Sequence, residues 1–135
     1  MDKISEHISY EESVKSQTAL RLGIKNVPDE HQLLNMRNVA EACFEPLRRW
    51  WGKPLVVSSF YRCPELNTAI GGAKTSQHMQ GKAIDIDTGS HEDNKKLFEY
   101  AKANLKFDQL LWEFGDDNGP SWVHISFDIG ANRNK

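Results

Sequence analysis

Residues 76–87 have the sequence Ser76-Gln77-His78-Met79-Gln80-Gly81-Lys82-Ala83-Ile84-Asp85-Ile86-Asp87. Its second half, residues 82–87, alternates polar and apolar side chains, which is typical of a strand with one buried face. Ile84 and Ile86 then face the core, and Asp85 and Asp87 share the opposite face. Gly81 provides a turn before this strand, so the loop that carries His78 can fold back over the polar face. The stretch therefore predicts a strand whose polar face meets a histidine.

Turn and capping residues divide the rest of the chain into further elements. Ser9 and Glu12 form a capping box that opens a short helix, which stops near Gly23. Pro28 and the acidic pair after it open a second helix, which ends at Gly52 and Pro54. The remaining expected elements are a buried strand over 55–60, a long loop over 61–81, a helix over 92–104 capped by Ser90, and two strands over 107–114 and 122–127. A strongly turn-forming segment, 115–120, joins the last two strands as a hairpin.

The second helix shows the three- and four-residue spacing of an amphipathic helix. Its apolar positions are Leu33, Met36, Ala40, Cys43, Leu47 and Trp50. The order of helices and strands predicts one compact α+β domain over residues 1–135, with a mainly antiparallel sheet flanked by helices. The helical segment over residues 1–25 is expected to pack on this domain.

Composition excludes several classes of protein. The net charge is −2 and no run of five Lys or Arg occurs, so nucleic acid is not expected as a partner. No stretch approaches 18 apolar residues and the N-terminus has no apolar signal region, so we expect no membrane span and a cytoplasmic protein. We also expect a monomer. Two cysteines are too few for a cysteine zinc site, and a buried free thiol at Cys43 is expected ahead of a disulfide with Cys63.

Three side chains far apart in the chain are candidates for one metal site. His78 and Asp85 are held together by the turn described above, and His124 lies mid-strand in Trp122-Val123-His124-Ile125-Ser126, opposite the apolar Val and Ile. Singly, His78 and Asp85 are most simply surface residues, whereas His124, flanked by core-facing residues, needs a polar partner. Together, two imidazoles and one carboxylate suit Zn²⁺ and leave a fourth position for water.

Three motifs give the chain a family resemblance. Residues 76–85 resemble the S-x-H-x-x-G-x-A-x-D signature of zinc D-Ala-D-Ala carboxypeptidases, which share the hedgehog/DD-peptidase fold with VanX-type dipeptidases and phage L-alanyl-D-glutamate endopeptidases. Ser59-Phe60-Tyr61-Arg62 resembles their S-x-Y-R element, and residues 122–126 resemble the W-x-H-x-S strand with the last ligand. The N-terminal helix resembles the compact, phage-associated branch. The resemblance implies that His78, Asp85 and His124 bind zinc.

The resemblance also implies substrate contacts. Arg62 would bind a substrate carboxylate through its planar guanidinium, the alternative being a structural ion pair. Ser76 would hydrogen-bond the substrate or orient a ligand, the alternative being a loop cap.

The general base is where the chain departs from the pattern. Several relatives carry an acid or a histidine three positions before the last ligand, where this chain has Ser121. Glu113 is the predicted substitute, because the hairpin would bring it close to His124. Asp116 and Asp117 in the turn are the fallback.

The resemblance implies a zinc metallopeptidase that hydrolyses peptide bonds in bacterial peptidoglycan, as a carboxypeptidase or an endolysin-type endopeptidase. It favours a phage or prophage lysis enzyme that stays in the cytoplasm until it reaches the cell wall. The alternatives are a zinc-binding domain without hydrolytic activity, which the serine at position 121 keeps open, and a virion-associated module that binds cell-wall peptides.

Overall fold

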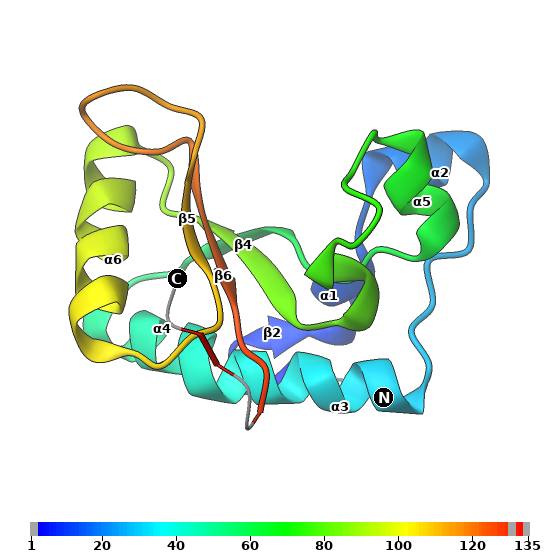
Figure 1. The fold of residues 1–135 in the computed structure, drawn as a ribbon, viewed down its shortest axis with the longest axis horizontal. Coiled ribbons are helices and arrows are strands. Elements are labelled where there is room, and N and C mark those ends of the chain that lie inside the picture. The colour runs from blue at the N-terminus through cyan, green and yellow to red at the C-terminus, as the bar shows by residue number, and fades with distance from the viewer. Residues whose placement is uncertain (1–2, 130–131, 134–135) are drawn as a thin grey trace.

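A four-stranded antiparallel sheet forms the centre of the molecule (Figure 1). The computed structural model describes residues 3–129 and 132–133. The strands are β3 (Val56–Ser59), β4 (Ala83–Asp87), β5 (Leu110–Glu113) and β6 (Trp122–Ser126), in the spatial order β3-β4-β6-β5. The two strands predicted to carry the metal ligands, β4 and β6, therefore lie in the middle of the sheet.

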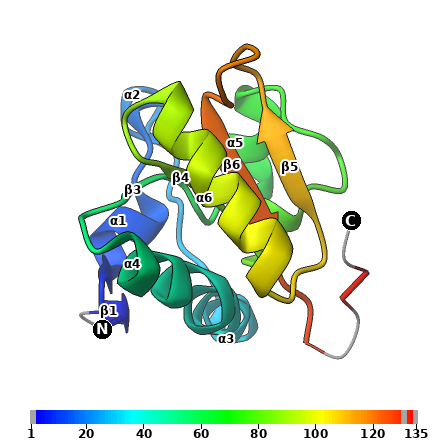
Figure 2. The same cartoon turned by 90° about the vertical axis from the view of Figure 1, so that its left-hand side faces the viewer.

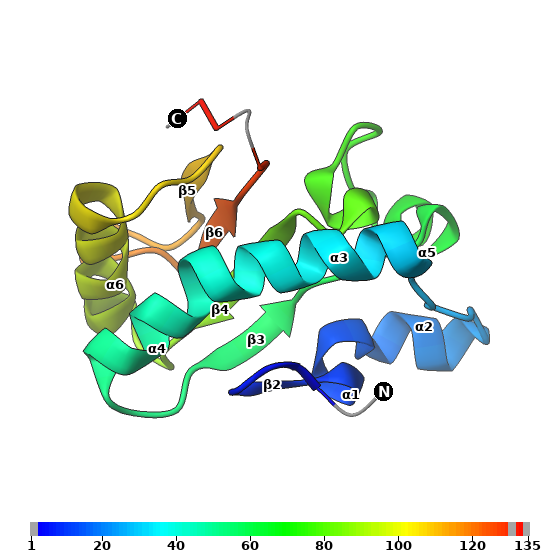
Figure 3. The ribbon, with the colours of Figure 1, turned by 90° about the horizontal axis from the view of Figure 1, so that it is seen from below.

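Helices cover the apolar face of this sheet. Figure 3 shows α3 (Glu30–Val39), the π-helical turn η1 (Ala40–Phe44) and α4 (Glu45–Trp51) as one long helix beneath it. Figure 2 shows α6 (His91–Asn104) in front of β6, and α6 contacts both β6 and β5. The side chains buried between these helices and the sheet include Met36, Phe44, Ile84, Ile86, Leu97, Val123 and Ile125. The prediction of one α+β domain with an antiparallel sheet flanked by helices is confirmed.

Local sequence explains the helix boundaries. Ser9 and Asp29 each form a capping box, and Ser90 caps α6 through the N–H of Asp93. Gly23 and Gly52 end helices in the left-handed conformation. The predicted starts of these three helices and the glycine stops are confirmed.

The N-terminal segment differs from the single predicted helix. It begins with a two-stranded hairpin, β1 (Lys3–Ser5) and β2 (Ile8–Ser9), and continues as two short helices, α1 (Tyr10–Val14) and α2 (Gln17–Leu22). The helix breaks because Lys15 is extended and the Ser16 side chain caps the next helix through the N–H of Ala19. The hairpin strands are too short to show an alternating pattern.

Three further expectations are wrong. The strand over 55–60 is not buried: β3 is an edge strand, and Val56 is 60% exposed. The loop over 61–81 contains a helix, α5 (Pro64–Ala69), and the 3-10 turn η2 (Gln77–Gln80). Trp50 is 43% exposed, because it lies in the last turn of α4, two residues before the cap Gly52, where it stacks on Tyr100. The expectation of a buried free thiol at Cys43 is confirmed, and Cys63 is also a buried free thiol.

Over the part of the chain that the structure describes, no helix has the length and apolarity of a bilayer span.

Candidate metal centre

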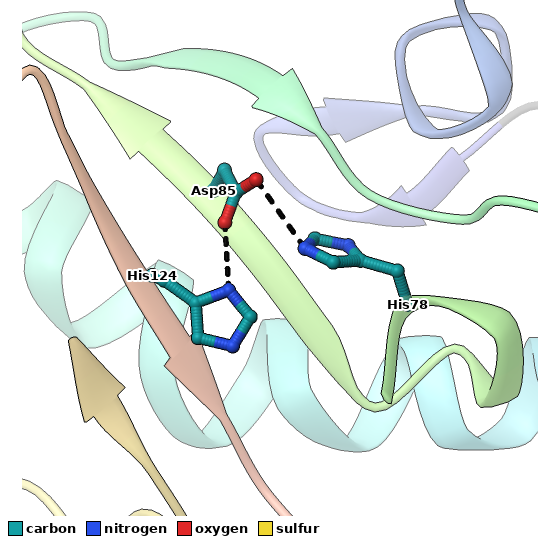
Figure 4. A group of neighbouring side chains, drawn as sticks. All are labelled: His78, Asp85 and His124. Atoms are coloured by element: carbon teal, nitrogen blue, oxygen red, sulfur yellow. Dashed lines mark hydrogen bonds and ion pairs between the residues drawn. The ribbon is translucent and has the colours of Figure 1, made fainter. Parts of the chain in front are cut away.

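Three side chains from separate elements converge on the polar face of the sheet (Figure 4). His78 comes from η2, Asp85 from β4 and His124 from β6. His78 Nε2 lies 3.3 Å from Asp85 Oδ2, and His124 Nδ1 lies 2.9 Å from Asp85 Oδ1. One ligand-type atom from each residue lies within 4.8 Å of the other two. The structure thus brings together the three residues proposed as ligands from the sequence.

The local backbone fixes where these side chains point. Asp85 is paired directly with His124 across β4 and β6, so both side chains leave the same face of the sheet. Gly81 follows η2 with φ +76°, and a Cβ atom there would lie 2.5 Å from the carbonyl oxygen of Gln32. Only glycine allows the turn that carries His78 to approach α3 so closely.

Burial and hydrogen bonding prepare the three groups to act as ligands. His78, Asp85 and His124 are 2%, 8% and 9% exposed. The carbonyl oxygen of Phe60 lies 2.6 Å from His78 Nδ1, and because a carbonyl only accepts, Nδ1 donates, so that with a metal bound Nε2 would present its lone pair to the ion. Burial acts to raise the pKa of Asp85, but hydrogen bonds from His124 and His78 and their charges outweigh it and lower the pKa from 3.8 to about 2.

This donor set fits zinc. Two imidazole nitrogens and one carboxylate oxygen are the protein ligands typical of catalytic zinc sites. The Phe60 carbonyl that orients His78 is the kind of outer contact that fixes a ligand's tautomer. Within the described chain the cluster has three members, which leaves a coordination position for water or substrate.

Arg62 lies beside this cluster. Its backbone N–H donates to the carbonyl oxygen of His78, and its Nη2 donates to Ser76 Oγ at 3.2 Å. Its Nε is buried and has no hydrogen-bond partner among the described residues. Burial lowers the pKa of Arg62, while the nearby carboxylates of Asp85 and Glu113 oppose that effect. Ser76 also accepts the N–H of His78, so this one serine contacts both the guanidinium and the ligand turn.

Glu113 faces the same cavity from β5. The cavity has a volume of about 780 Å³, and its lining includes Glu113, Arg62 and the three clustered residues. Glu113 is half-buried and pairs with Trp122 in the sheet. The N–H of Ser121 donates to the carbonyl oxygen of Glu113 at 2.9 Å. Ser121 is thus the chain neighbour of Trp122, the residue paired with Glu113 across the hairpin.

A comparison with protein families agrees with this geometry. The family model of peptidase M15 matches residues 6–126. The chain belongs to this family. Membership makes it a peptidase, and the zinc dependence of M15 peptidases fits the cluster of His78, Asp85 and His124. No curated protein matches the chain.

Other acids of this M15 peptidase lie elsewhere. The Asp116 carboxylate accepts the N–H of Asn118 in the turn and lies 3.4 Å from His91 Nδ1. Asp117 is exposed. Asp87 accepts from the N–H of Gly89 and from Asn94. Among the described acids, these three do not line the cavity over the cluster.

A second acidic group near the N-terminus has a structural role. Glu45 is 1% exposed, and its carboxylate accepts from Ser5 Oγ, from the His7 backbone N–H and from His7 Nδ1 at 2.6 Å. Burial acts to raise the pKa of Glu45, but these hydrogen bonds lower it overall. Because its oxygens are engaged, Glu45 fixes the β1–β2 hairpin to the long helix.

Proposed function

We propose that this M15 peptidase uses zinc to hydrolyse peptide bonds in the stem peptides or cross-links of bacterial peptidoglycan. The single observation that carries the proposal is the buried cluster of His78, Asp85 and His124, which opens into a cavity that also holds Glu113 and Arg62. Ligands, a proton acceptor and a cation are the parts that metal-assisted amide hydrolysis needs. The peptidoglycan substrate rests on the resemblance of the three motifs to cell-wall peptidases.

Glu113 is proposed as the general base. His78, Asp85 and His124 would hold a zinc ion, which would supply the Lewis acidity for the reaction. Glu113 accepts the proton of the attacking water at its carboxylate and then donates it to the leaving amine. Its half-buried position keeps it in the cavity, and its backbone is held at the hairpin end by Ser121 and Trp122.

Arg62 is proposed to bind substrate oxygen. Its buried Nε has no partner among the described residues, so an oxygen of the substrate would satisfy that donor. Charge also develops on the scissile carbonyl oxygen during attack, and a fixed guanidinium nearby stabilises it. Ser76 holds Nη2 of Arg62 and so fixes the orientation of the guanidinium.

Digestion of purified peptidoglycan tests this function. The zinc-loaded protein is incubated with sacculi, and soluble fragments are identified by mass spectrometry. We expect peptide fragments from the wild-type protein, their loss on chelation and their return on adding zinc. We expect none from His124→Ala. Fragments that persist in chelator with zinc-free protein would contradict the proposal.

The serine at position 121 favours a second candidate, a domain that binds zinc and cell-wall peptides without cleaving them. That candidate predicts stoichiometric zinc binding and pelleting with sacculi, with no new amino groups released. Release of amino groups by the wild-type protein, lost in Glu113→Gln, would eliminate it.

A further inference from the structure

Two cavities meet beside Asp85, one of the three clustered residues. Beside the cavity described above lies a second one, with a volume of about 320 Å³. We call the larger the β5 arm and the smaller the β3 arm. Their linings share Arg62, Ile70, Asp85 and Trp122. One of the proposed ligands therefore belongs to both arms.

The two arms extend to opposite edges of the sheet. The β3 arm is lined by Ser58 and Ser59 of edge strand β3, and the β5 arm by Leu111 and Glu113 of edge strand β5. The cluster lies between them on the central strands β4 and β6. A chain bound across the sheet would pass over the cluster and continue on both sides.

The N-terminal segment builds the outer wall of the β3 arm. Residues 15–17, at the junction of α1 and α2, line it. This junction is tied to the segment of Arg62 by Asn26, which is 8% exposed. Its Nδ2 donates to the carbonyl oxygens of Val14 and Tyr61, and its Oδ1 accepts the N–H of Cys63 at 2.7 Å. The wall is therefore fixed relative to the cluster.

We propose that this chain cuts internal peptide bonds, with substrate residues bound in both arms, and does not trim single terminal residues. The inference rests on the proposed peptidase function. An enzyme that removes one terminal residue needs a closed pocket with its cation at the far end. Here Arg62 lies at the junction of the arms, and space continues beyond it toward Lys15 and Gln17.

The charge of the β3 arm selects the substrate residue it binds. Its lining has two cations, Lys15 and Arg62, and its one carboxylate is the proposed ligand Asp85. Lys15 is exposed. The arm therefore suits a substrate residue with a carboxylate, inside a longer peptide.

Matched peptides test the inference. Stem peptides isolated from peptidoglycan are prepared with a free or an amidated C-terminus and digested with the zinc-loaded protein. We expect cleavage at one internal bond, with at least two residues on each side. Amidation of the C-terminus should change kcat/KM less than about threefold, because the enzyme makes no ion pair with the terminal carboxylate. Release of the last residue alone, with a loss of roughly 100-fold or more on amidation, would overturn the inference while leaving the peptidase function intact. No hydrolysis of either peptide would overturn both.

A bulky residue in the β3 arm gives an independent test. Gln17 lines this arm, whereas Arg21, on the same helix, is exposed and lines neither arm. We expect Gln17→Trp to raise KM for the stem peptide about tenfold, with Arg21→Trp close to wild type. Equal zinc content and equal melting temperatures show that both variants fold. Equal KM values for the two variants would show that the β3 arm does not bind substrate.

Discussion

Replacing Glu113 by glutamine should abolish most hydrolysis without disturbing the metal site. Glutamine has nearly the same shape but cannot accept the proton of the attacking water. Glu113 is two residues from Leu111, which pairs directly with His124. Such diagonal neighbours in a sheet lie roughly 7–8 Å apart, a separation that a glutamate side chain and one water can span.

The expected magnitude follows from the role of a general base. Positioned acid–base groups contribute about 10²–10⁴ in rate, so Glu113→Gln should lower kcat by that factor, or roughly 3–5 kcal/mol of transition-state stabilisation. Zinc affinity should stay the same, because Glu113 is not in the cluster of His78, Asp85 and His124. KM should also change little.

The assay is steady-state release of amino groups from stem peptides, with zinc content measured on the same samples. Asp117→Asn is the matched control, because Asp117 is an exposed acid of the adjoining turn and lines neither arm. A Glu113→Gln enzyme with more than about a tenth of the wild-type kcat would refute the reasoning. An equal loss in Asp117→Asn would refute it as well.

Three other substitutions test the framework around the site. Gly81→Ala should cost roughly 1–3 kcal/mol of stability and weaken zinc binding in a titration, since the new Cβ meets the Gln32 carbonyl at a positive φ; unchanged zinc affinity would contradict this. Phe44→Ala should lower the free energy of unfolding by about 3–5 kcal/mol in urea melts, against about 1 kcal/mol for the exposed Trp50→Ala; similar losses would show that the buried position is misassigned. Hydrogen bonds from the Arg133 side chain, and to a smaller extent one from Gln77, lower the pKa of Asp108 below 3.8. The ionised carboxylate therefore stabilises the fold above pH 3.8, and this stabilisation is lost as the pH falls through the lowered pKa. Asp108→Asn should therefore be less stable than wild type at pH 7, and the difference should shrink below pH 4 in urea melts; a constant difference would argue against the ionised pair.

Signals that act over a few residues predicted much of the fold. Capping side chains mark helix starts at Ser9, Asp29 and Ser90, because a cap satisfies backbone donors within its own turn. The alternation in residues 82–87 predicts β4 because its two faces meet core and cavity. These features are encoded in the neighbouring residues alone.

Features that depend on distant contacts were missed. Nothing in residues 55–60 shows that β3 has a neighbour on one side only, so the apolar run by itself predicts a buried strand. The clamp of Asn26 depends on residues 14, 61 and 63, and an asparagine in a loop carries no signal for it. The β3 arm could not be predicted, because it lies between residues 15–17 and Leu66 of α5, a helix in a segment that the sequence predicts to be a loop.

The hairpin links the proposed base to position 121, where the resemblance to cell-wall peptidases predicts an acid or a histidine. Residues 113 and 121 lie at the same end of β5 and β6, joined by the hydrogen bond from the Ser121 N–H to the Glu113 carbonyl oxygen. Ser121 itself does not line the cavity over the cluster, but a longer carboxylate side chain at that position starts one hydrogen bond away from Glu113. Reaction geometry constrains the place of the proton acceptor but not the strand that supplies it. On this reasoning, Glu113→Gln combined with Ser121→Glu should regain part of the lost kcat, and the double variant staying as inactive as Glu113→Gln would show that the two positions are not equivalent.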